Sequence, residues 1–393
     1  MNRKFWKKEL LPALLAVMTG MVTAAVVFSI FCGGLQNALA AFRYGNALGV
    51  IRANYIAQTD ANAMTDAALS AAVNSLGDRW SYYMNEESYE DYKDAAANRY
   101  QGIGVTISKE EATGGFLVAA VTKDGPADQA GIVAGDILLA VDGTDVTGGT
   151  TEDIRALIQA DFGREAIVTV VHSDGTQEDL AVSCEEIYQN PVEYELLAGK
   201  VGYIRLKNFR SQAGEETIAA AEALVEQGAE SLLFDVRANP GGQVSELVAV
   251  LDYLLPEGDV FIRADKRGRE VAEISDEKWL DIPAAVLVNA DSYSAAEFFA
   301  AALQEYDRAI VVGEPTTGKA RSQVTIPLLD GGAVHVSRYT YLTPERVDLY
   351  EAGGIVPSVE VSLTEEEQLE FDTGWLEPAS DPQLLAAIDA LSA

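Results

Sequence analysis

The chain has 393 residues, of which 48% are hydrophobic and 23% charged, a composition typical of a folded protein of two or three domains. Its formal net charge of −33 argues against nucleic acid or anionic lipid as a partner, because affinity for phosphate groups comes from Lys and Arg. We interpret the acidic surface as a solvated face that keeps the protein soluble.

The N-terminus is predicted to cross a membrane. A basic cluster from Arg3 to Lys8 precedes a 22-residue, mostly apolar run from Leu10 to Phe31, and positions 10–42 hold no charged residue. Roughly 20 apolar residues span a bilayer as a helix, which exceeds the core of about 7–15 residues in a signal peptide. The basic flank predicts a cytoplasmic N-terminus and an extracytoplasmic remainder. The alternative is a cleaved signal peptide, for which residues 38–40 (Ala-Leu-Ala) offer a small-residue cleavage site.

Residues 43–97 are predicted to be helical. Tyr44, Leu48, Ile51 and Tyr55 fall on one helical face, and the pattern repeats farther along. This region is interpreted as a packing cap or a dimerisation arm, so a homo-oligomer is one expectation, and it carries no recognisable chemistry.

A β-rich segment follows at residues 98–187. It contains an apolar run from Phe116 to Val121, a helix-like run from Thr151 to Ile158, and a glycine-punctuated series from Gly125 to Gly143. This order resembles a PDZ domain, whose carboxylate-binding loop is matched by Gly102, Ile103, Gly104 and Val105. Glycines let successive backbone N–H groups converge on a chain-terminal carboxylate, and the strand edge accepts the peptide as an added strand. The alternative is a small β-domain whose glycines only form turns.

In residues 188–378, strands and helices alternate. Such alternation predicts an α/β core. A basic hairpin with Lys266, Arg267 and Arg269 at its tip precedes the third strand. The expected strands are Val201–Leu206, Ser231–Val236, Ala284–Val288 and Ala309–Val312, and the expected helices include Glu215–Glu226, Val244–Leu255 and a last one from Asp381 to Leu391.

Two turns of this core have the same form. One strand leads to Gly241, Gly242 and a helix, and another leads through Asn289 to Ser294 and a helix. Helix N-termini present unpaired N–H groups and a partial positive charge. If the turns lie side by side, the N–H groups of Gly242 and Ala295 aim at one point, as an oxyanion hole requires, while the Ser294 hydroxyl attacks a carbonyl.

Ser294 also has a purely structural interpretation. Residues 294–297 (Ser-Ala-Ala-Glu) have the form of a capping box, in which Ser294 caps the helix and Glu297 caps back. Taken alone, these four residues favour a helix-capping role for Ser294 over a nucleophilic one. Ser292, on the same turn, is a rival nucleophile.

Lys319, in a Gly-Lys loop, is the candidate general base. A lysine base must be neutral, and burial in an apolar pocket achieves this by lowering its pKa from about 10.4. A solvated surface lysine is the alternative. Gln323, four residues on, is placed to hydrogen-bond the amine. A histidine base is disfavoured, because His335 lies in an alternating strand and His172 lies in the PDZ-like segment.

Neither a metal nor another cofactor is expected. The two histidines are 163 residues apart, with no clustered Cys/His spacing near either. Cys32 and Cys184 are the two cysteines, and Cys32 lies at the end of the apolar run, so no internal disulfide is expected in the exported part.

From residue 43 onward the chain resembles the C-terminal processing peptidases, also called tail-specific proteases. The resemblance implies that Ser294 is the nucleophile, that Lys319, 25 residues on, is the base, and that Gln323 supports the lysine. It also favours Ser294 over Ser292 and implies a crotonase-like (ClpP-like) α/β core with an inserted PDZ domain. The matching segments are Gln101 to Val105, the PDZ series, Val201 to Phe209, Asp235 to Gly242, Asn289 to Glu297 and Val312 to Gln323, and they carry the oxyanion donors over to Gly242 and Ala295.

Three departures from the family pattern stand out. Tyr293 replaces the usual small residue before the nucleophile, and Ser358 follows Pro357 where an acid is common. Residues 320–321 (Ala-Arg) stand where the family tends to have a glycine and a small residue. None removes a catalytic group, but Arg321 is expected to lower the pKa of the nearby lysine further or to alter peptide choice.

The combined prediction is a membrane-anchored, extracytoplasmic serine endopeptidase. Its PDZ domain recognises the C-termini of protein substrates, and its Ser-Lys dyad cleaves through an acyl-enzyme. The expected domains are 1–42 (basic stub and transmembrane anchor), 43–97 (helical region), 98–187 (PDZ domain) and 188–393 (protease core with tail). The alternative is a catalytically inactive PDZ scaffold that binds the C-termini of exported proteins.

Overall fold

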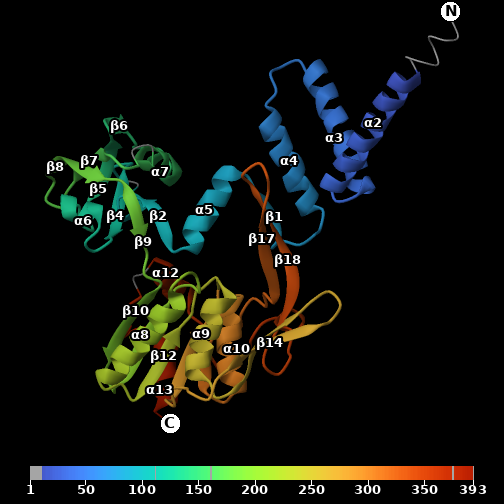
Figure 1. Ribbon diagram of the computed structural model, residues 1–393. Helices are drawn as coiled ribbons and strands as arrows, with labels where there is room; N and C mark the ends of the chain where they lie inside the picture. The colour runs from blue at the N-terminus through green and yellow to red at the C-terminus, as the bar shows by residue number, and fades with distance from the viewer. Residues whose placement is uncertain (1–10, 111, 160–161, 374–375, 393) are drawn as a thin grey trace, which may run out of the picture. The chain divides into compact units, whose positions relative to one another are not determined.

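A computed structural model of the chain describes residues 11–110, 112–159, 162–373 and 376–392 (Figure 1). The chain forms two compact units, residues 1–83 and 84–393. The predicted basic cluster from Arg3 to Lys8, and Leu10 of the predicted membrane segment, lie outside the described residues.

The first unit is helical. Its helices are α2 (Leu11–Phe31), α3 (Leu35–Asn54) and α4 (Ala61–Asn74). Within α2, Ala13–Phe31 is long and apolar enough to cross a membrane, a property that a signal sequence shares. The prediction of a wholly helical stretch up to residue 97 is wrong at β1 (Tyr82–Met84), an extended segment that precedes α5 (Glu86–Ala96).

The segment after α5 is a small β-structure with its own core. Five strands form a sheet in the order β3-β4-β5-β7-β8, β6 pairs with β5, and β2 pairs with β9. Phe116, Val118, Leu138 and Ile154 are among the side chains buried inside it. Its elements are β2 (Arg99–Gly102), β3 (Val105–Lys109), β4 (Phe116–Val121), α6 (Pro126–Ala130), β5 (Ile137–Val141), β6 (Thr144–Asp145), α7 (Thr151–Gln159), β7 (Glu165–Val171), β8 (Gln177–Ser183) and β9 (Glu185–Tyr188).

The main sheet has the order β10-β11-β12-β15-β16-β19. Strand β10 runs antiparallel to β11, and the other pairs are parallel. Parallel strands need crossover connections, which the intervening helices provide. The strands are β10 (Val192–Leu197), β11 (Val201–Leu206), β12 (Ser231–Asp235), β15 (Ala284–Val288), β16 (Ala309–Gly313) and β19 (Val359–Glu360).

Helices cover both faces of this sheet. In Figure 1, α8 (Ala213–Glu226), α9 (Val244–Leu254) and α10 (Ala295–Glu305) lie side by side. Leu232 and Phe234 of β12 belong to the core beneath these helices, whereas Leu233 packs with α13 (Pro382–Leu391) on the opposite face. Successive residues of a strand point to opposite faces, so a continuous apolar strand such as β12 is buried by helices on both sides.

A second sheet contacts helix α10 through its strand β13 (Gly258–Ala264). It contains the predicted hairpin, seen as β13 and β14 (Glu270–Ser275), together with β17 (Arg321–Pro327) and β18 (Ala333–Leu342). The remaining helices of this part are α11 (Leu349–Ala352) and α12 (Glu365–Thr373). Gln323 therefore lies in a strand, just after the loop that carries Lys319.

Candidate active site

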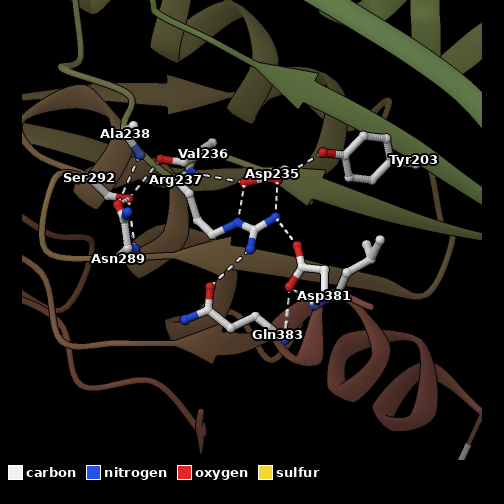
Figure 2. Close-up of polar contacts among 10 residues, drawn as sticks. Tyr203, Asp235, Val236, Arg237, Ala238, Asn289, Ser292, Asp381 and Gln383 are labelled. Carbon is white, nitrogen blue, oxygen red and sulfur yellow. Dashed lines mark hydrogen bonds and ion pairs between the residues drawn. The ribbon is translucent and has the colours of Figure 1, made fainter. Parts of the chain in front are cut away.

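Two turns meet at one edge of the main sheet. Strands β12 and β15 are parallel neighbours with Asp235 opposite Leu287, so both chains leave the sheet at the same end. The Ser292 hydroxyl donates to the carbonyl oxygen of Val236 at 2.7 Å, and the Tyr293 N–H donates to that of Asn239 at 3.1 Å. Figure 2 shows the Ser292 part of this connection. The turn after β12 and the turn after β15 are thus bonded to each other.

Ser294 occupies a strained backbone position at the start of α10. Its φ of 59° and ψ of −125° lie outside the regions that most L-residues adopt. A strand-to-helix turn with such a serine projects the hydroxyl away from the sheet, as in the nucleophile turn of many hydrolases. Strain of this kind persists only where the surrounding structure enforces it.

Ser292 is unsuited to the nucleophilic role. Its side chain is fully buried. Its hydroxyl donates to the Val236 carbonyl oxygen and also accepts from the Asn289 N–H at 3.0 Å. A hydroxyl held this way supports the turn and has no access to a substrate.

Glu297 connects the turn that holds Ser294 to the loop that holds Lys319. Its buried carboxylate accepts from the N–H groups of both Ser294 (2.9 Å) and Lys319 (2.8 Å) at the same oxygen, Oε2. The other oxygen, Oε1, accepts from the Thr316 hydroxyl at 2.6 Å and the Gly318 N–H at 2.5 Å. Four donors satisfy a carboxylate that would otherwise be costly to bury. This role is missed by sequence reasoning, because the loop partners lie 19 to 22 residues away.

The capping box predicted from residues 294–297 is present at the start of α10. Ser294 and Glu297 occupy its two positions, and the Glu297 carboxylate accepts from the Ser294 N–H as expected. The Glu297 N–H also lies 2.9 Å from the carbonyl oxygen of Ser294 and donates to it. The positive φ departs from the extended backbone of an ordinary N-cap residue.

Lys319 is half-buried and lies beside Tyr293. Its Nζ atom is 5.4 Å from the centroid of the Tyr293 ring, within the range of a cation–π contact. Gln323, predicted to support the amine, donates from its amide nitrogen to the Arg321 carbonyl oxygen at 2.7 Å and to the Ser337 hydroxyl at 3.1 Å. These bonds fix the orientation of the Gln323 amide on β17.

Arg321 has a partner that the sequence does not reveal. Its guanidinium forms an ion pair with Asp348 at 3.0 Å and lies 4.5 Å from the centroid of the Tyr350 ring. Since Asp348 compensates the charge of Arg321, we expect less electrostatic influence on Lys319 than a bare cation would exert.

The turn that contains Gly241 and Gly242, called the glycine turn below, lies directly against Ser294. At Gly241, which has a φ of +83°, an added Cβ would be 2.8 Å from both the Ser294 Cβ and the Ala295 nitrogen. At Gly242, an added Cβ would be 2.1 Å from the carbonyl oxygen of Phe209, whose segment pairs with this turn. Only glycine fits at either position. The backbones of the two predicted oxyanion donors, Gly242 and Ala295, are therefore brought close together.

A cavity lies in the β-structure of residues 99–188. It has a volume of about 310 Å³ between the loop before β3 and helix α7. All four residues of the predicted carboxylate-binding loop line it, namely Gly102, Ile103, Gly104 and Val105, together with the apolar side chains of Ile107, Ile154 and Ile158.

The two histidines are engaged in local contacts. His335 Nδ1 lies 2.8 Å from the Thr325 hydroxyl, and His172 Nδ1 lies 2.9 Å from the buried Asp136 carboxylate. The hydrogen bond to Asp136 raises the pKa of His172 above its ordinary value. Within the described ranges, no three His, Cys, Asp or Glu side chains form a group that could hold a metal ion.

Comparison with known proteins agrees with these features. Residues 200–361 match the model of peptidase family S41, and residues 117–171 match that of a PDZ domain. The chain is 28% identical over 323 residues to the carboxy-terminal processing protease CtpA of Bacillus subtilis (strain 168), covering 82% of this chain and 69% of that one. It is 33% identical over 297 residues to the chloroplastic carboxyl-terminal-processing peptidase 1 of Arabidopsis thaliana, covering 72% and 60%. The chain thus spans between 60% and 69% of the length of these two relatives.

The fold has a counterpart among solved structures. A protein of Bacteroides fragilis NCTC 9343, assigned by name to the S41 proteases, superposes with a TM-score of 0.57 at 18% sequence identity. The likeness covers 88% of this chain and 96% of that protein and concerns the fold alone. Residues 200–361 are thus similar to the peptidases of family S41 and residues 117–171 to PDZ domains, and most of the chain is similar to carboxy-terminal processing peptidases that the two relatives represent.

Proposed function

We propose that this chain cleaves peptide bonds with Ser294 as nucleophile and Lys319 as general base. The observation that carries the proposal is the Glu297 carboxylate, which bonds the backbone N–H groups of both residues at one oxygen atom. The strained φ of Ser294 and the glycine turn packed against it support the same assignment.

Acylation needs four groups to act together. The neutral Lys319 amine accepts the proton of the Ser294 hydroxyl as Oγ attacks the carbonyl carbon of the substrate. The negative charge that develops on the carbonyl oxygen is stabilised by the N–H groups of Gly242 and Ala295. Collapse of this intermediate breaks the C–N bond, and the Lys319 ammonium gives its proton to the departing amine.

Deacylation repeats these steps with water. Lys319 takes a proton from the water that attacks the acyl-enzyme, and returns it to Ser294 Oγ as the ester bond breaks. In this proposal the oxygen of the Gln323 amide accepts from the lysine ammonium, while the amide nitrogen is held by the Arg321 carbonyl oxygen and the Ser337 hydroxyl. Burial beside the Tyr293 ring restricts the positions that the amine can take.

The PDZ domain delivers the substrate in this proposal. Its cavity accepts a chain end, with the carboxylate on the loop of residues 102–105 and an apolar last side chain between Ile107 and Ile154.

The apolar part of α2 serves as a single-pass anchor with the catalytic part outside the cytoplasm. The core is of the crotonase-like (ClpP-like) type, and the chain divides into domains at 1–42, 43–97, 98–187 and 188–393.

Hydrolysis of casein by the purified protein tests the dyad. Ser294→Ala and Lys319→Ala are each expected to abolish it, while Ser380→Ala and Lys266→Ala, which change exposed residues, leave it intact. A serine-reactive fluorophosphonate should label the protein at Ser294. Activity retained in either dyad variant would disprove the assignment. Peptide binding by the unaltered protein without hydrolysis or labelling would point instead to an inactive PDZ scaffold.

A further inference from the structure

A buried arginine lies at the root of the glycine turn. Arg237 follows β12, and its side chain is 3% exposed. Asp235 receives it in a two-point contact, accepting from Nε at 3.0 Å and from Nη2 at 2.6 Å (Figure 2). The Tyr203 hydroxyl donates to the same carboxylate at 2.8 Å. Such a fork-to-carboxylate contact fixes direction as well as distance.

The C-terminal helix supplies the other half of the arginine's environment. Asp381 approaches Nη2 to 2.8 Å, and Gln383 accepts from Nη1 at 3.0 Å. Asp381 also caps α13 by accepting from the N–H groups of Gln383 and Leu384, while the Gln383 amide nitrogen donates to the Val361 carbonyl oxygen. The Phe371 ring of α12 lies 4.6 Å from the guanidinium. The tail of the chain thus encloses Arg237.

These charges stabilise one another strongly. Burial disfavours the charged guanidinium, but the charges and hydrogen bonds of Asp235 and Asp381 outweigh it and raise the pKa of Arg237. Burial alone would raise the pKa of Asp235, yet Arg237 holds it below its usual value. A buried ion pair resists displacement, because removing one partner leaves an uncompensated charge.

The backbone on either side of Arg237 is bonded to the nucleophile turn. The preceding carbonyl, of Val236, accepts from Ser292, and the following N–H, of Ala238, donates to the Asn289 side chain at 2.9 Å. Ala238 has a positive φ of 56°, and the Asn239 side chain accepts from the Gly241 N–H at 2.8 Å. The direction of the Gly242 N–H therefore depends on a short segment that begins at Arg237.

We propose that α13 is part of the active-site scaffold. In this scaffold, Asp381 and Gln383 are positioning residues that act through Arg237 on the glycine turn, which carries the Gly242 N–H. The inference rests on the proposed peptidase function for its kinetic consequence. An oxyanion donor acts on the transition state, so a misdirected Gly242 N–H lowers kcat and leaves KM nearly unchanged. Losing such a donor altogether costs about 100- to 1,000-fold in kcat, and a displaced one is expected to cost about tenfold or more.

Asp381→Asn in the full chain is the main test, because asparagine still caps a helix but carries no charge for Arg237. Asp389→Asn, an exposed position on the same helix, is the matched control. We expect Asp381→Asn to lower kcat on a peptide substrate at least tenfold with KM changed less than threefold, and Asp389→Asn to change neither. Gln383→Ala is the second variant if Asp381→Asn does not fold, and it should shift kcat in the same direction.

The rate of backbone hydrogen exchange in the peptide covering residues 236–243 measures the stability of the glycine turn without reference to catalysis. Exchange should be faster in Asp381→Asn than in the unaltered protein and in Asp389→Asn. If exchange is faster in Asp381→Asn but the unaltered protein hydrolyses no peptide, the scaffold role is supported and the peptidase function is contradicted. Unchanged exchange, or an unchanged kcat accompanied only by a lower melting temperature, would overturn the proposal and leave α13 with a purely structural role.

Discussion

One buried carboxylate organises the candidate site at the scale of single residues. Glu297 receives four hydrogen bonds, and they come from both segments that hold the proposed dyad. Its position therefore determines how the Ser294 turn lies relative to the lysine loop. Because each bond involves a charged acceptor, each is worth about 1.5–3 kcal/mol.

Glu297→Gln is expected to lower kcat/KM by tenfold or more. The amide keeps the shape of the side chain but turns an NH₂ group toward N–H donors, so that at least one side of the bridge is lost. Steady-state kinetics on a peptide, with circular dichroism to establish folding, measures the effect. Gln304→Ala, near the other end of α10, serves as the control and should retain full activity. An equally active Glu297→Gln enzyme would show that the bridge does not position the dyad.

The sequence can nominate catalytic residues but not their environment. Ser294, Lys319 and Gln323 are predicted from spacings of 25 and four residues, which a resemblance can use directly. The partners of Glu297 and the pairing of Arg321 with Asp348 depend on loops that only the fold brings together. No local pattern encodes such contacts, whereas the capping box at residues 294–297 is a local pattern and is confirmed.

At the scale of elements, the apolar strands were the most predictable part of the fold. Val201–Leu206 and Ala284–Val288 agree residue for residue with the prediction, because continuous apolar runs are needed where helices cover both faces. Strand β10 and helix α12 were not predicted. Four of the six residues of β10 are exposed, and α12 has three acidic residues in its first turn. Both elements are held by tertiary pairing and packing, which local sequence does not display.

The glycine turn gives a sharp prediction at this scale. Gly241→Ala should abolish hydrolysis, because its Cβ would lie 2.8 Å from backbone and side-chain atoms of the Ser294 turn. Gly228→Ala is the matched control, since Gly228 also has a positive φ (+96°) but has no atom within 4 Å of an added Cβ. In the control variant, only the strain of an alanine at a positive φ lowers the free energy of unfolding, by about 1–2 kcal/mol.

Thermal unfolding and casein hydrolysis separate the two variants. Gly228→Ala should melt at a lower temperature with unchanged kcat/KM at 25 °C. Gly241→Ala should lose activity even under conditions where circular dichroism shows it folded. If both variants lose stability alike and both remain active, the close approach of the two turns is unimportant for the reaction.

The whole molecule combines a PDZ domain with the proposed cleavage site, so the choice of substrate is a property of this scale. The PDZ cavity is lined by a glycine loop and by isoleucine side chains, a combination that suits a free carboxylate next to an apolar side chain. A peptide ending in a carboxylate should therefore be bound more tightly than the same peptide ending in a carboxamide. A charge-assisted hydrogen bond is worth about 1.5–3 kcal/mol, which corresponds to about tenfold or more in affinity.

Paired variants on strand β3 test this directly. Ile107 lines the cavity, whereas Thr106 is its exposed neighbour on the opposite face of the strand. Ile107→Asp should raise KM for the carboxylate-ended peptide about tenfold, since the new charge repels the carboxylate and removes apolar surface. Thr106→Asp should leave KM unchanged and so controls for the added charge. Equal KM values for the carboxylate and carboxamide peptides would mean that the PDZ cavity does not select substrates by their C-termini, and the specificity would then have to arise around Ser294 itself.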